Sequence, residues 1–74
     1  MKDYEIVCTY LNACAGAAYP QRSFEEVSLA DPADYILAKH GKDAQKFQKQ
    51  VQPDGRIIYA YRDAVTYIYD FTEL

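Results

Sequence analysis

The sequence predicts an α+β fold: a small single-layer antiparallel sheet with one helix packed on one face, in the element order β-β-α-β-β-β. Three observations carry this prediction: an alternating segment at the N-terminus, a helix start at Asp31-Pro32, and a turn at Pro53-Asp54-Gly55 between two apolar runs. A chain of 74 residues is long enough to bury one hydrophobic core but not two. We therefore expect residues 1–74 to form a single domain.

The N-terminal third predicts a hairpin. Residues 3–11 alternate between apolar and polar side chains, which is the pattern of a half-buried strand. The apolar positions are Tyr4, Ile6, Cys8 and Tyr10. Residues 22–29 predict the second strand, in which Phe24, Val27 and Leu29 alternate imperfectly. Small side chains fill residues 12–20 between them, so we expect a loop there.

The predicted helix begins after Asp31 and ends at His40. The Asp31 side chain can accept hydrogen bonds from the first turn, and Pro32 at the first helical position loses no hydrogen bond. Gly41 is suited to end the helix, and an imidazolium at His40 would interact favourably with the last carbonyls. The stripe predicted to face the core consists of Ala33, Ile36, Leu37 and His40.

The C-terminal third predicts a three-stranded meander whose register follows from its turns. The first turn places Val51 opposite Ile57, Lys49 opposite Tyr59 and Phe47 opposite Tyr61. A reversal at residues 62–64 would then pair Tyr61 with Val65, Tyr59 with Tyr67 and Ile57 with Tyr69, with Arg56 meeting Asp70 on the other face. This register gathers the aromatic residues on one face, where core packing explains them.

Residues 43–51 allow two interpretations. Ala44, Phe47, Gln48 and Val51 share a helical face, and the Lys and Gln content favours a helix. We prefer a strand from about Lys46, because the turn that follows needs a partner strand.

Charge and apolar run length argue against two classes of partner. The net charge is −3 and the basic residues are scattered, so we expect no nucleic-acid binding. No apolar run approaches the roughly 20 residues that span a bilayer, and acids occupy the N-terminus where a signal peptide would be basic and then apolar. We therefore expect no membrane contact and a cytosolic location.

Residues 12–20 contain the positions that we single out as a candidate binding site. They are Asn12, Cys14, Gly16 and Tyr19. A reactive thiol at Cys14 would need a base, and His40 is the only histidine in the chain. Cys8, which alternates with apolar neighbours, is expected to be a small buried hydrophobic side chain. The spacing of Cys8, Cys14 and His40 matches no common metal motif, so we predict no metal site and no cofactor.

The leading functional hypothesis is a small non-enzymatic protein-interaction or regulatory module. A protein partner, or a second copy of the chain, would bind an open edge strand or the loop of residues 12–20. The alternative is a thiol-dependent activity at Cys14 with His40 as its base.

Overall fold

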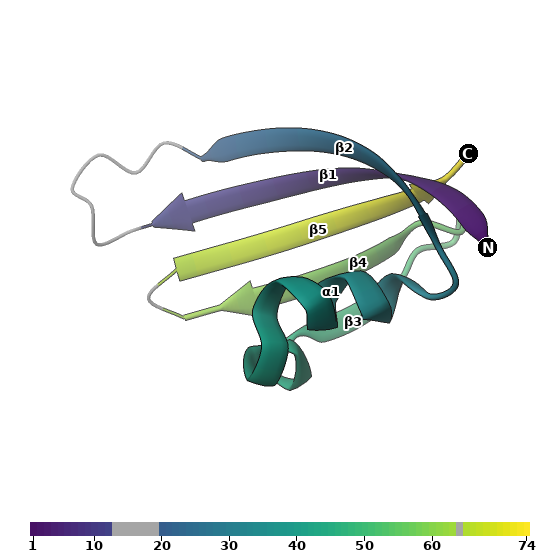
Figure 1. Ribbon diagram of the computed structural model, residues 1–74. Helices are drawn as coiled ribbons and strands as arrows, with labels where there is room; N and C mark the ends of the chain where they lie inside the picture. Colours follow the sequence, from purple (N-terminus) through teal and green to yellow (C-terminus); the bar gives the residue numbers. More distant parts are fainter. Residues whose placement is uncertain (13–19, 64) are drawn as a thin grey trace.

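The computed structural model describes residues 1–12, 20–63 and 65–74 and has one five-stranded antiparallel sheet, in the order β2-β1-β5-β4-β3 (Figure 1). Its elements are β1 (Lys2–Asn12), β2 (Gln21–Leu29), α1 (Pro32–His40), the 3-10 helix η2 (Gly41–Lys46), β3 (Gln48–Val51), β4 (Ile57–Arg62) and β5 (Val65–Glu73). The predicted fold class and the order β-β-α-β-β-β are confirmed. The C-terminal strand lies in the middle of the sheet, between the two hairpins.

One face of the sheet carries the helices. α1 and η2 pack on the face to which the even-numbered residues of β1 and the odd-numbered residues of β5 contribute. No element within the described ranges covers the other face, which we call the open face. The two termini lie at the same end of the sheet, where the Leu74 N–H donates to the Asp3 carbonyl oxygen at 2.9 Å.

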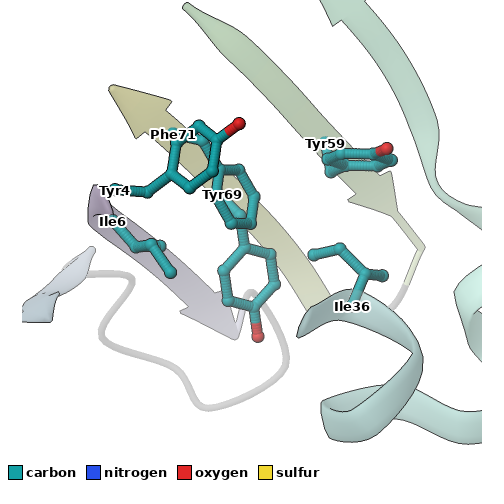
Figure 2. Packing of buried hydrophobic residues seen from close by; sticks show 6 residues of the cluster. All are labelled: Tyr4, Ile6, Ile36, Tyr59, Tyr69 and Phe71. Atoms are coloured by element: carbon teal, nitrogen blue, oxygen red, sulfur yellow. The ribbon is translucent and has the colours of Figure 1, made fainter. Parts of the chain in front are cut away.

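Aromatic rings dominate the core beneath α1 (Figure 2). Its buried residues are Tyr4, Ile6, Ile36, Tyr59, Tyr69 and Phe71. Phe71 is completely buried, and the rings of Tyr4 and Tyr59 meet it edge-on at centroid distances of 6.2 and 5.9 Å. Edge-to-face contact is the arrangement that the ring quadrupoles favour. The aromatic face of the predicted meander is therefore a packed surface.

The ends of α1 match the prediction, but the face that it buries does not. The Asp31 carboxylate accepts from the Ala33 N–H at 2.9 Å, and Gly41 caps the last turn. The predicted stripe is wrong at two positions, since Ala33 is exposed and Leu37 is 59% exposed. Tyr35 faces the sheet instead, because its ring has more area to bury against Tyr69 and Phe71.

The register of the first C-terminal turn is confirmed. Val51 pairs with Ile57 and Lys49 with Tyr59, and the Gln52 N–H donates to the Arg56 carbonyl oxygen at 2.8 Å. Gly55 has a φ of 93°, a conformation that glycine adopts without steric cost.

The register of the second reversal differs from the prediction by two residues. Tyr61 pairs with Tyr67, Tyr59 with Tyr69 and Ile57 with Phe71. Strand β4 continues one residue further than predicted, through Arg62, and the Asp63 N–H donates to the Val65 carbonyl oxygen at 3.0 Å. A shift of two leaves every side chain on its predicted face, so hydrophobic alternation could not detect it.

The predicted contact between Arg56 and Asp70 is present despite this shift. The Arg56 guanidinium Nη1 donates to Asp70 Oδ2 at 2.7 Å, reaching diagonally past Ile58, the backbone partner of Asp70. The other oxygen, Oδ1, is buried and has no hydrogen-bond partner in the described part of the chain.

Both interpretations of residues 43–51 are partly correct. The chain stays helical through η2 as far as Lys46, and Phe47 is extended, with φ −75° and ψ 138°. Strand β3 begins at Gln48, two residues after the predicted start. Phe47 packs beside Tyr61, with ring centroids 5.4 Å apart, which is the neighbour that the turn register predicts.

Candidate interaction surface

Most of the binding site predicted from sequence falls outside the described residues. Asn12 ends β1 opposite Val65. Cys14, Gly16 and Tyr19 lie in the segment 13–19, which the structure does not describe. Their grouping as a site therefore stays a prediction.

His40 has a different environment from the one that we predicted for it. Its ring lies among Phe47, Tyr67 and Tyr69, and its Nε2 shares a hydrogen bond of 2.7 Å with the Tyr69 hydroxyl. The Gly41 backbone N–H, and not the imidazole, satisfies a carbonyl of the last turn, that of Leu37. His40 thus anchors the end of α1 to the sheet through aromatic contacts.

Burial lowers the pKa of His40, with Lys39 acting in the same direction and Asp43 against it. Protonation is therefore harder in the folded state than in the unfolded chain, whose histidine titrates near pH 6.5. Between the folded-state pKa of His40 and pH about 6.5, the unfolded state binds more protons than the folded state. The free energy of unfolding is therefore highest above pH about 6.5 and decreases as the pH falls through the folded-state pKa.

We expect the urea midpoint of unfolding to decrease as the pH falls from about 7 to about 5.5, where aspartate and glutamate titrate little. His40→Gln should remove most of this dependence. An unchanged slope in that variant would contradict the assignment to His40.

Cys8 faces the helix side and packs partly buried against the core, beside its strand partner Tyr69. Burial raises the pKa of the Tyr69 hydroxyl, and the Cys8 thiol acts in the same direction. These contacts fit the predicted role of Cys8 as a small packed side chain.

A depression of about 480 Å³ lies on the open face. It is lined by β3, β4 and β5, and Lys49 and Arg62 are its charged residues. Among the described residues its lining holds no carboxylate, imidazole or thiol. Such a lining can contact a polypeptide but offers no acid–base pair or nucleophile.

The comparisons give no family. No protein-family model, curated protein or solved structure matches the chain. Residues 1–12, 20–63 and 65–74 contain no group of three or more His, Cys, Asp and Glu side chains that could hold a metal ion. Within the same ranges, no helix is long and apolar enough to cross a membrane.

The two edges of the sheet are unequal. β3 is an edge strand of four residues that carries Lys49 and ends at a proline turn, three features that discourage pairing with another chain. β2 is an edge strand of nine residues without lysine or proline, and its residues from Gln21 to Glu26 are all exposed. In Figure 1 no element of the described ranges lies along its outer side. β2 is therefore the edge that is open to another strand.

The free hydrogen-bonding groups of β2 can be assigned by counting. Successive residues of a strand direct their N–H and C=O groups to opposite neighbours, and Asp3 of β1 bonds Leu74 on the β5 side. The backbone N–H and C=O groups of the even-numbered residues of β1 therefore bond to β2. Their partners in β2 are all odd-numbered residues, because the β1–β2 register continues without a bulge. The residues of β2 whose backbone groups point outward are Arg22, Phe24, Glu26 and Ser28.

These outward-bonding residues also place their side chains on the open face. Phe24 is 70% exposed and stands beside Val7 of β1. Arg22 and Glu26, two residues away on either side, form no ion pair or hydrogen bond within the described part of the chain. In the sequence Phe24 belongs to the same imperfectly alternating segment as Val27 and Leu29, although its even number assigns it to the opposite face of the sheet. An apolar residue at an even position, in a strand whose other large apolar residues are at odd positions, is the signal that could have identified this surface.

Proposed function

We propose that the chain is a non-enzymatic protein-interaction module that binds a polypeptide strand along the free edge of β2. The observation that carries the proposal is the combination of outward backbone groups and an exposed ring at Phe24. In this mode the main-chain hydrogen bonds provide affinity, and alternate side chains provide specificity.

The composition of the surface supports binding over catalysis. The open face next to β2 carries Val7, and Leu11 and Ile68 lie further along the same face, all partly exposed. Phe24 extends this apolar strip to the edge, with charges on either side of it. An apolar centre with a charged rim is the usual anatomy of a protein interface.

The proposal includes a cytosolic location, which the scarcity of cysteines favours. The thiol alternative at Cys14 gains no support, because Nε2 of its proposed base, His40, is engaged by Tyr69. Absence of nucleic-acid binding also stays a prediction.

A proline at position 24 tests the edge directly. The Phe24 N–H points away from β1, so Phe24→Pro leaves the β1–β2 ladder intact while it removes an outward donor and the exposed ring. We expect the variant to keep its circular dichroism spectrum and to lose at least about tenfold in affinity for any partner captured by the wild-type chain.

The direct readout is amide hydrogen exchange of the complex. Partner binding should protect the outward amides of Arg22, Phe24 and Glu26 and leave those of β3 unchanged. Leu37→Ser, an exposed change on α1, is the matched control and should bind normally. A partner that binds Phe24→Pro as tightly as the wild type would contradict the proposal.

A further inference from the structure

The sequence of β2 is complementary to itself when two copies run antiparallel. If Phe24 lies on a twofold axis, Phe24 faces its own equivalent and Arg22 faces Glu26 of the other copy. The symmetry repeats this ion pair on the other side of the axis. All three side chains lie on the open face, and both charges have no other partner in the described part of the chain.

The backbone agrees with this register. Arg22, Phe24 and Glu26 are the residues whose N–H and C=O groups point outward, so each paired position can exchange two hydrogen bonds. The pairing ends where Ser28 would meet Pro20, which has no N–H to donate. Val27 opposite Gln21 is then the last pair within β2.

Neighbouring registers are less favourable. An axis at Ser23 places Arg22 opposite Phe24 and leaves Glu26 without a charge partner. An axis at Glu25 places Phe24 opposite Glu26 and sets two Glu25 carboxylates against each other, and an axis at Glu26 opposes two Glu26 carboxylates. Like charges directly opposite destabilise strand pairing, so charge selects the axis at Phe24.

The apolar strip of the open face supports the same arrangement. Val7 pairs with Phe24 across β1 and β2, and the axis brings in the equivalent pair of the other copy. Across the two paired β2 strands, the side chains on the open face then follow in the order Val7, Phe24, Phe24 and Val7. Each exposed ring would lose solvent contact against the other ring.

We propose that the partner of β2 is a second copy of this chain, joined in an antiparallel twofold dimer with Phe24 at its axis and Arg22–Glu26 ion pairs on both sides. This inference rests on the proposed function, because it names the occupant of the same edge. Pairing of the two β2 strands forms one continuous sheet through both copies and leaves neither β2 edge free.

Charge reversal tests the register. Arg22→Glu would oppose two pairs of glutamates across the axis, and Glu26→Arg would oppose two pairs of arginines. We expect each single variant to raise the dimer dissociation constant at least about tenfold in sedimentation equilibrium. Arg62→Glu makes the same charge change as Arg22→Glu on the open face of β4 and should leave the constant unchanged.

Restoration gives the decisive result. Mixing the two single variants makes every cross-axis pair opposite in charge, so the mixture should form a heterodimer with a constant within about threefold of the wild-type value. The double variant, which exchanges the two charges within one chain, should dimerise with itself equally well. Circular dichroism of each variant checks that the exposed substitutions leave the fold intact.

Three results would overturn the self-pairing. They are a wild-type chain that stays monomeric at about 1 mM, a dimer insensitive to both reversals, and reversals that the mixture does not rescue. If the self-pairing fails and Phe24→Pro still abolishes binding of another protein, the proposed function stands. If Phe24→Pro affects no interaction at all, both proposals fall.

Discussion

Phe71→Ala is expected to remove a large share of the protein's free energy of unfolding. Phe71 is completely buried at the centre of the core, where Tyr4, Tyr35 and Tyr59 surround its ring. Truncation of a buried phenylalanine costs about 3–5 kcal/mol, because the contacts are lost and a cavity remains. The total stability expected of 74 residues is only about 4–11 kcal/mol.

Urea unfolding followed by circular dichroism measures this effect. Phe24→Ala removes the same side chain from a position that is 70% exposed, and at dilute concentration it should cost about 0.5 kcal/mol or less. Equal destabilisation by the two variants would mean that the core is not centred on Phe71.

Ile36→Ala is expected to cost about 2–5 kcal/mol, the usual range for truncating a buried isoleucine. Ile36 is 1% exposed and belongs to the core cluster that packs α1 on the sheet. A helix of nine residues has little stability of its own, so losing this contact should loosen α1 as well.

Leu37→Ala is the matched control for the rotation of α1. The helical spacing in the sequence predicts Leu37 beside Ile36 on the buried stripe, but Leu37 is 59% exposed. We therefore expect this change to stay within about 0.5 kcal/mol in the same urea experiment. Similar losses for the two variants would favour the stripe predicted from sequence over the one observed.

These core positions are separate from the proposed binding edge. Arg22, Phe24 and Glu26 are exposed, so their substitution tests binding without removing core contacts. Loss of association in those variants can therefore be distinguished from loss of folding.

The candidate surface could be predicted only in part. The sequence indicated a second strand and an open edge, but it did not show which edge is open. It also left the face of Phe24 unassigned, because spacing alone does not assign an imperfectly alternating residue to a face. The strand order decides both points, since it places β2 at the outside and turns Phe24 to the open face.

Local chemistry alone determined several elements of this protein. Asp31 and Pro32 define the start of the helix, Gly55 permits the turn before β4, and alternation assigns the C-terminal aromatics to one face. Each of these features depends on residues close together in the chain, so the sequence is sufficient to predict them.

Tertiary structure decided the rest. The placement of β5 beside β1, the rotation of α1 toward Tyr35, and the two-residue shift after Arg62 all depend on contacts between distant segments. The alternation of side chains along a strand repeats every two residues, so it does not distinguish two registers that differ by two residues. The sequence of a short helix is likewise compatible with burial of either of two overlapping stripes. In the observed arrangement Phe71 is completely buried among the rings of Tyr4, Tyr35 and Tyr59, and this burial of apolar surface between distant segments stabilises it.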